Sequence, residues 1–381
     1  MIYLDNAATS YPKPKSVIQA VTAQMAQVGG NAGRSSHQGG LASSRILYET
    51  RCAISRLLNV SDPLQINFTL NATEALNLVI HGALNPGDHV VTTSMEHNSV
   101  LRPLKAVEKK GITHTIVWGD AEGKVDPAMI EKAIGPKTRM LILNHCSNVT
   151  GTLQSLPEMM AMALNHQLMT LVDASQSCGS IPINVEALQI DFLAAPGHKA
   201  LFGPQGTGFL YIHKKNKIRA LKQGGTGSRS EDLNQPELIP DCYESGTQNI
   251  HGLAGLKAGV DFILEEGLET IHDQEQQRMM QLMEGLSVIP GITLFGPGKM
   301  TDRGSVVTFR AGTMDVNQIN YVLDMVYGIS ARAGLHCAPL AHQTLGTFPE
   351  GTLRFSPGYF TTKEEIDEVL KAMNEISKQT V

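Results

Sequence analysis

The sequence predicts an α/β protein in which helices cover both faces of a mostly parallel central sheet. Two observations support this prediction. From about residue 60 to residue 212, short apolar runs alternate with segments of helical spacing, which is the order typical of strands joined by helical crossovers. Polar residues suited to catalysis follow several of these runs, where open α/β sheets bind their ligands.

The expected strands are strand-like runs of about five residues, near 65–69, 89–93, 113–118, 139–143, 168–172, 191–195 and 208–212. The expected helices carry apolar residues at helical spacing and lie near 73–82, 98–110, 127–134 and 156–166. The Gly-rich stretch 223–232 is expected to be a mobile loop. A helical segment from about 251 to 285 then leads to a second unit of strands and helices that ends near residue 378.

A length of 381 residues suggests two domains, each with its own core. We expect a large domain over residues 14–255 and a smaller α/β domain formed by residues 1–13 and 256–381. Hydrophobic residues make up 42% of the chain and charged residues 18%, as in a soluble globular protein.

Charge and cysteine usage limit the partners and the compartment. The net charge of −5 provides no general attraction to nucleic acid or an anionic membrane, and no apolar run approaches the roughly 18–20 residues of a membrane span. No basic n-region or apolar signal core precedes the motif at Asp5, so no signal peptide is expected, and the cysteines show no C-x-x-C or disulfide-framework spacing. A cytoplasmic location is therefore expected. The five cysteines are Cys52, Cys146, Cys178, Cys242 and Cys337.

Lys199 follows the expected strand 191–195 and precedes a Gly/Pro turn. A primary amine at a strand end can form a Schiff base with an aldehyde cofactor if it is partly desolvated or close to another cation. A lone lysine is more often solvated, but Asp173, at the end of the run 168–172, favours the cofactor hypothesis. A carboxylate there suits the nitrogen of a pyridine ring, although Asp173 alone could be a turn or cap residue.

Two further residues complete the pattern. Thr73 lies at the start of the helix 73–82, where free backbone N–H groups bind anions such as phosphate, although it could simply cap the helix. His97 follows the strand 89–93, and an imidazole there can stack on a cofactor ring and relay protons.

With these elements the chain resembles a fold-type I pyridoxal phosphate enzyme of the class V aminotransferase group, and within it a cysteine desulfurase or selenocysteine lyase. The resemblance runs nearly end to end, through the motifs at 3–9, 31–37, 147–151, 244–247, 332–338 and 352–356. It implies that L-cysteine or L-selenocysteine is the substrate. It also implies a homodimer, because in the family the segment 244–247 reaches the phosphate of the neighbouring subunit.

The resemblance also implies the role of each site residue. The cofactor would be bound by Lys199, Asp173, Gln176, His97, Thr73, Ser175, His198 and Thr247. The substrate would be bound by Arg354, Asn148 and Arg34, and catalysis would be carried by Lys199, His97 and Cys337.

Cys337 is the residue on which the specific chemistry depends. A lone cysteine is usually a small buried hydrophobe, but Gly334 and Pro339 indicate an exposed turn, and Arg332 and His336 could supply the positive charge that favours a thiolate. A metal site built from His336, Cys337 and His342 is conceivable but lacks a second ligand pair, so no metal is expected. The resemblance implies that Cys337 accepts the substrate sulfur as a persulfide and passes it to a protein acceptor.

Two departures from the family pattern matter. Pro196 stands where the lysine motif often has a hydroxyl residue, and Leu335 stands where a second histidine is common. Another pyridoxal phosphate lyase or aminotransferase, in which Cys337 is incidental, remains an alternative because fold does not fix function. A non-enzymatic scaffold in sulfur trafficking is disfavoured because Lys199, Asp173, His97 and Arg354 are all intact.

Overall fold

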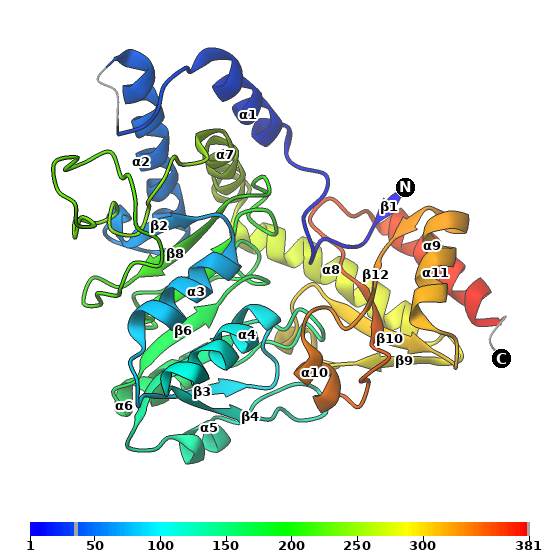
Figure 1. Cartoon of the computed structure of the whole chain (residues 1–381). Helices are drawn as coiled ribbons and strands as arrows, with labels where there is room; N and C mark the ends of the chain where they lie inside the picture. Colours follow the sequence, from blue (N-terminus) through cyan, green and yellow to red (C-terminus); the bar gives the residue numbers. More distant parts are fainter. Residues whose placement is uncertain (34–36, 379–381) are drawn as a thin grey trace.

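The computed structural model describes residues 1–33 and 37–378. It has a large unit built on a seven-stranded sheet and a second unit built on a four-stranded sheet (Figure 1). The predicted α/β class with a mostly parallel central sheet is confirmed. No helix in the described residues is long and apolar enough to span a membrane.

Each of the seven strands in the large sheet lies within one residue of its predicted bounds. In spatial order they are β2 (Ile66–Thr69), β8 (Gly208–Ile212), β7 (Phe192–Pro196), β6 (Met169–Asp173), β5 (Thr138–Asn144), β3 (His89–Thr93) and β4 (Thr113–Val117). The strands β4, β3, β5, β6 and β7 are parallel to one another. The strand β8 runs antiparallel to both of its neighbours.

Helices cover both faces of this sheet because side chains alternate between faces along each strand. Met140 and Ile142 pack with α3 (Ala72–Ala83) and α4 (Asn98–Val107), whereas Leu141 and Leu143 belong to the core on the opposite face. That opposite core includes α1 (Lys15–Gln27), α2 (Gln38–Leu58), α5 (Pro127–Ala133), α6 (Leu156–Asn165) and α7 (Ile250–Glu266).

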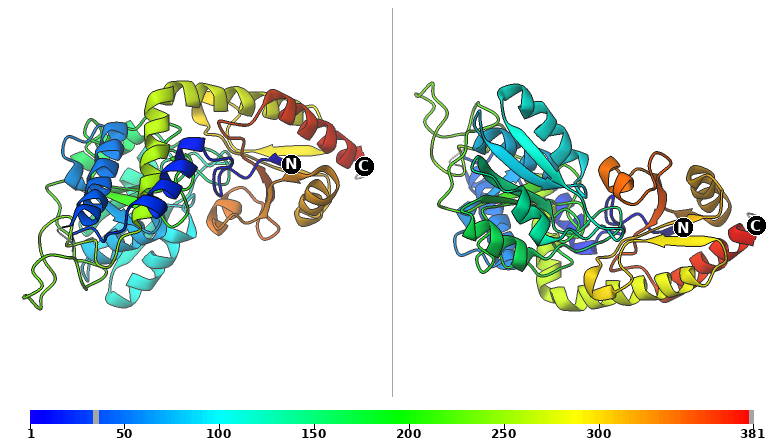
Figure 2. Two further views of the ribbon diagram at one scale, coloured as in Figure 1. Left: turned by 90° about the horizontal axis from the view of Figure 1, so that it is seen from above. Right: turned by 90° about the horizontal axis from the view of Figure 1, so that it is seen from below.

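The second unit contains an antiparallel sheet with its own core. Its strands, in spatial order, are β12 (Arg332–Gly334), β13 (Thr352–Phe355), β10 (Val307–Ala311) and β9 (Ile292–Phe295). Its helices are α8 (Leu268–Ser287), α9 (Val316–Tyr327), α10 (Pro339–Thr344) and α11 (Lys363–Lys378). The N-terminal strand β1 (Ile2–Tyr3) pairs with β11 (Ile329–Ser330), so the start of the chain lies against this unit (Figure 2).

The segment predicted to be helical over residues 251–285 is divided into α7 and α8 at Gly267. Gly267 has a φ of 87°, a left-handed conformation that glycine adopts without the strain imposed on other residues. The change of direction lets α7 pack on the large unit and α8 on the second unit (Figure 2).

Arg303 joins the second unit to a loop that borders the sheet of the large unit. Its side chain is fully buried, and its guanidinium donates hydrogen bonds of 2.8–3.0 Å to four carbonyl oxygens. One acceptor is Thr150, in the loop that follows β5, and the others are Phe295, Pro297 and Val306. The loop after β5 is thereby held against the second unit.

We expect Arg303→Met to lower the free energy of unfolding by about 3 kcal/mol or more, because buried carbonyl groups left without a donor are destabilising. Urea denaturation followed by circular dichroism measures the change. Arg45→Met is the control, because Arg45 is exposed and, among the described residues, forms an ion pair with Glu49 alone, one helical turn away, a contact worth about 0.5 kcal/mol or less. A loss below about 1 kcal/mol for Arg303→Met would contradict the proposed anchoring.

Candidate active site

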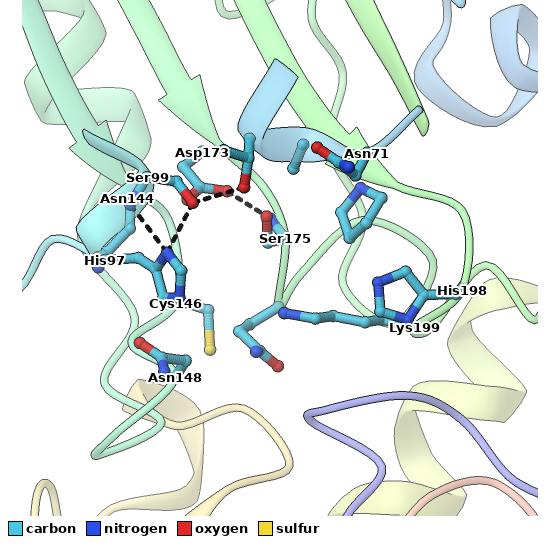
Figure 3. A pocket seen from close by; sticks show the side chains of 14 residues that line it. Asn71, His97, Ser99, Asn144, Cys146, Asn148, Asp173, Ser175, His198 and Lys199 are labelled. Atoms are coloured by element: carbon cyan, nitrogen blue, oxygen red, sulfur yellow. Dashed lines mark hydrogen bonds between the residues drawn. The ribbon is translucent and has the colours of Figure 1, made fainter. Parts of the chain in front are cut away.

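A cavity opens at the carboxyl ends of the parallel strands of the large sheet (Figure 3). Its walls bring together residues from the loops after β2, β3, β5, β6 and β7. The lining residues are Asn71, Ala72, Thr73, His97, Ser99, Asn144, Cys146, Asn148, Asp173, Ser175, Gln176, Pro196, His198 and Lys199. Eight of the sequence-predicted site residues are among them.

Lys199 reaches the cavity from the turn after β7 (Figure 3). Burial, together with the nearby charges of Arg354 and Arg332, lowers the pKa of its amine to about 8, against the opposing effect of Asp173 and Asp5. A lysine with this pKa presents a substantial fraction of free amine near neutral pH, which is the nucleophilic form.

Asp173 ends β6 with its carboxylate at the cavity, and its side chain is almost fully buried. The backbone N–H of Ser175 donates to Oδ1 at 2.9 Å, which fixes the carboxylate. Gln176 also lines the cavity and donates from Nε2 to the carbonyl of Ala7 at 3.0 Å. The N-terminal segment therefore contacts the cavity wall directly.

His97 caps the N-terminus of α4, and its Nδ1 accepts the backbone N–H of Ser99 at 3.0 Å. This hydrogen bond places the ring proton of the neutral imidazole on Nε2. Burial lowers the pKa of His97, against the opposing effect of Asp173, so the neutral form is favoured. The Ser99 hydroxyl lies 2.8 Å from His97 Nδ1 and 2.7 Å from the Thr73 hydroxyl, and it links the two residues (Figure 3).

The N-terminus of α3 forms another wall of the cavity. Asn71 caps it by accepting the backbone N–H of Glu74 at 2.9 Å, and the positive end of the helix dipole is directed toward Thr73 and the cavity. The side chain of His198 lines the same cavity, and burial lowers its pKa to about 4. It is therefore a neutral donor or acceptor near an anion site.

Cys337 lies in a turn after β12, and its side chain is exposed. His336 and Cys337 both have left-handed backbone conformations, with φ of 48° and 60°, which are unfavourable for residues other than glycine. Two hydrogen bonds hold this turn. The backbone N–H of Asn98 donates to the Cys337 carbonyl at 2.8 Å, and the Asn148 amide donates to the His336 carbonyl at 2.6 Å.

The expected charge environment of Cys337 is confirmed for one neighbour and wrong for the other. Arg332 donates from Nη2 to Cys337 Sγ at 3.7 Å. His336 is buried, and burial together with the charges of Arg354 and other neighbours lowers its pKa well below the usual range, so it supplies no positive charge. Across residues 1–33 and 37–378, no group of three His, Cys, Asp or Glu side chains could hold a metal.

Arg354 is fully buried in β13 and is already paired. Its Nη2 donates to Asp5 at 2.7 Å, and its Nη1 donates to the carbonyl of Asn148 at 3.0 Å. Its Nε is buried and has no partner among the described residues. Asp5 therefore fixes the guanidinium plane while one donor is left for another group.

Three predicted residues lie apart from the cavity lining. Cys337 and Arg354 come from the second unit. Arg332, from the same unit, is close enough to the cavity for its charge to lower the pKa of both Lys199 and His97. Thr247 is exposed on the surface of the large unit. Arg34 lies outside the described residues.

Sequence reasoning missed Ser99, Asn71, Asn144 and Cys146 as lining residues. Asn144 ends the buried strand β5 beside Asp173, so the polar strand-end signal that identified Asp173 also applied to it. Asn71 carried the signal of a helix cap. No sequence feature marked Cys146, whose thiol is buried and has a pKa raised to about 12 by burial.

Pyridoxal phosphate fits this arrangement of groups. Lys199 offers an amine of lowered pKa, and Asp173 offers a fixed carboxylate that matches a protonated pyridine nitrogen. The start of α3 offers backbone N–H groups, which suit a phosphate. Pro196 also lines the cavity and can donate no hydrogen bond, so one wall lacks the donor that a hydroxyl residue would supply.

If burial sets the pKa of Lys199, the rate at which the apoprotein takes up pyridoxal phosphate should level off above about pH 8, because the free amine is the reacting form. The absorbance of the Schiff base measures this rate. Lys199→Ala is the blank for other amines, including Lys13, whose pKa burial also lowers to about 8. If the rate instead levels off only near the ordinary lysine pKa of about 10.4, the Lys199 amine is solvated.

One family model matches the sequence along most of its length. A family model described as aminotransferase class-V matches residues 2–369. A probable cysteine desulfurase from Methanothermobacter thermautotrophicus is 35% identical, covering 99% of this chain and 94% of the relative. One from Halalkalibacterium halodurans is 34% identical, covering 98% and 92%.

Solved structures agree with these sequence matches. The apo cysteine desulfurase from Thermococcus onnurineus NA1 has a TM-score of 0.93 and 32% identity, covering 99% of this chain and 95% of that chain. A cysteine desulfurase from Escherichia coli has a TM-score of 0.88 and 28% identity, covering 100% and 95%. The protein therefore belongs to the aminotransferase class-V family.

Proposed function

We propose that the protein is a cysteine desulfurase that converts L-cysteine to L-alanine and receives the sulfur on Cys337 as a persulfide. The observation that carries this proposal is the exposed Cys337 turn. Its backbone is tied to Asn98, which follows His97, and to Asn148, which lines the cavity of Lys199. The names of the relatives and of the solved structures support the same activity.

Enzymes of this family depend on pyridoxal phosphate, and we propose that Lys199 Nζ binds it covalently. Asp173 pairs with the pyridine nitrogen, and the second N–H of the Gln176 amide serves the ring hydroxyl. The phosphate is held by Thr73, Ser175 and His198. When bound, pyridoxal phosphate would supply an electron-accepting pyridinium ring that stabilises negative charge at the substrate carbon.

In this proposal, Arg354 and Asn148 bind the substrate. The carboxylate of L-cysteine receives a charge-assisted hydrogen bond from Arg354, whose plane is fixed by Asp5. Asn148 links this region to the cysteine turn, because its carbonyl contacts Arg354 and its amide contacts His336. A bound carboxylate and the Cys337 turn are thereby linked through one residue, by the backbone carbonyl and the side-chain amide of Asn148.

Lys199 and His97 move protons in this scheme. The Lys199 amine, in its free form, would accept the α-proton of the substrate, and its lowered pKa suits it to act near neutral pH. His97 keeps its proton on Nε2, the ring nitrogen left toward the cavity when Nδ1 binds Ser99 (Figure 3). It can donate that proton to a reacting atom in the cavity.

Cys337 carries the sulfur step. Its thiolate attacks the sulfur of L-cysteine, so a new S–S bond forms while the bond between sulfur and Cβ breaks. The electron pair of the broken bond remains with the substrate carbon, which takes up a proton to become the methyl group of alanine. Arg332 donates from Nη2 to Sγ at 3.7 Å and so orients the sulfur for the transfer.

We also propose a homodimer, a protein sulfur acceptor and a cytoplasmic location. Thr247 and Gly246 are exposed, as suits a segment that contacts the phosphate site of a neighbouring subunit. The exposure of Cys337 suits direct transfer of sulfur to an acceptor protein. All five cysteines are free thiols, which suits a reducing compartment. The division into domains at residue 255 stays a prediction.

Cys337→Ala should bind pyridoxal phosphate and change its spectrum on addition of L-cysteine, yet form almost no alanine, because it lacks the attacking thiolate. The wild-type protein, treated with L-cysteine without reductant, should gain roughly 32 Da, the mass of one sulfur atom, on the Cys337 peptide. Alanine analysis and peptide mass spectrometry measure these results. Cys52→Ala, at a half-buried thiol on α2, is the control and should retain full activity.

Full alanine formation by Cys337→Ala would contradict the proposal and favour another pyridoxal phosphate lyase.

Arg354→Lys should raise the KM for L-cysteine about 30-fold, which corresponds to about 2 kcal/mol. Lysine keeps the charge but loses the planar donor group. Steady-state kinetics measure the change. Arg310→Lys is the control, because Arg310 lies in the neighbouring strand β10 and its donors bind Gly351 and Thr347. An unchanged KM for Arg354→Lys would exclude Arg354 from carboxylate binding.

A further inference from the structure

Glu96 is a fully buried carboxyl group immediately behind the cavity wall. It follows β3 and precedes His97, and its contacts reach β5, whose last residue, Asn144, lines the cavity. The roles proposed above for the cavity residues do not use it. A buried charge is strongly disfavoured unless it is paired. The protonation state of Glu96 therefore affects how this wall of the cavity is held.

The hydrogen bonds of Glu96 are unevenly distributed between its two oxygens. Oε1 accepts the Thr93 hydroxyl at 2.7 Å and the backbone N–H of Asn144 at 3.0 Å. Oε2 is buried and has no partner among the described residues. As a carboxylate, Glu96 would therefore leave one charged oxygen unsatisfied, whereas as a carboxylic acid it carries a proton that can sit on Oε2.

A matching acceptor is present on Asn144. The amide Nδ2 of Asn144 donates to the carbonyl of Met95, which fixes the orientation of the side chain because an amide oxygen could not face that carbonyl. The amide Oδ1 is buried and has no partner within residues 1–33 and 37–378. Glu96 and Asn144 thus each present a buried, unsatisfied oxygen, and a single proton would convert this pair into a donor and an acceptor.

We propose that Glu96 is held as a neutral carboxylic acid that donates from Oε2 to Asn144 Oδ1 and so acts as a positioning residue for Asp173 and His97. Asn144 pairs with Asp173 in the register of β5 and β6, and the next residue, His145, donates its backbone N–H to the Asp173 carbonyl at 3.0 Å. Glu96 therefore supports the strand end that carries the Asp173 carboxylate, and by chain continuity it supports the His97 cap.

Electrostatics agree with this assignment. Burial and, to a smaller extent, the Asp173 charge on β6 raise the pKa of Glu96 to about 8, against hydrogen bonds from Thr93 on β3 and Asn144 on β5. Two close carboxylates do not both ionise readily. The acid form of Glu96 therefore predominates below about pH 8.

The test compares Glu96→Gln and Glu96→Ala with the wild-type holoenzyme. Glutamine keeps the acceptor oxygen and replaces the acidic O–H with an N–H donor. At about pH 6, below the raised pKa, the infrared spectrum of the wild type should contain the carbonyl band of a protonated carboxylic acid that Glu96→Gln removes. Glu275→Gln is the control for assigning bands, because Glu275 is a second buried carboxyl, bound to Ser305, whose pKa burial raises to about 7.

Kinetics give the second readout. Glu96→Gln should keep kcat within about threefold of the wild type, whereas Glu96→Ala should lower kcat about tenfold or more with little change in KM, because Asp173 and His97 lose their support. Thermal unfolding identifies any general loss of stability.

The absence of a carboxylic acid band assignable to Glu96 would overturn the inference, as would a loss of kcat beyond about tenfold in Glu96→Gln. The inference rests on the proposed function only for its kinetic readout, because the infrared measurement needs no substrate. An enzyme that shows the band and forms no alanine would refute the proposed function and leave the protonation state of Glu96 established.

Discussion

The parallel alignment of β3, β5, β6 and β7 is the constraint on which the site depends. Parallel strands end at the same edge of a sheet, so the residues that follow them meet there. His97, Asn148, Asp173 and Lys199 come from four separate segments yet line one cavity for this reason. Burial at this edge lowers the pKa of Lys199 and His97, so the alignment determines both the positions and the protonation states of these groups.

The second unit adds what the parallel sheet lacks. It supplies the buried guanidinium of Arg354 and the exposed thiol of Cys337, while hydrogen bonds from Asn98 and Asn148 of the large unit hold the cysteine turn in its left-handed conformation. Arg303 anchors the loop that carries Asn148. In the proposed reaction, the cofactor groups belong to one unit and the sulfur acceptor to the other.

The sequence was sufficient to predict the central sheet because each of its strands is a short apolar run followed by polar residues. It also indicated His97, Asp173 and Lys199 at the strand ends that line the cavity, but it missed Asn144, which ends β5. It did not reveal the break at Gly267, because apolar spacing continues through it. The positive charge expected of His336 was wrong because burial cannot be read from a turn motif. The pairing of Arg354 with Asp5 joins residues far apart in sequence and has no local signal.

The central claim is that Lys199 is the covalent anchor of the cofactor. Borohydride reduction of the holoenzyme, followed by proteolysis and mass spectrometry, tests it most directly because reduction converts a Schiff base into a stable amine. The account predicts the pyridoxyl group on the peptide that contains Lys199. Attachment to another lysine, such as Lys13 beside His198, would contradict it.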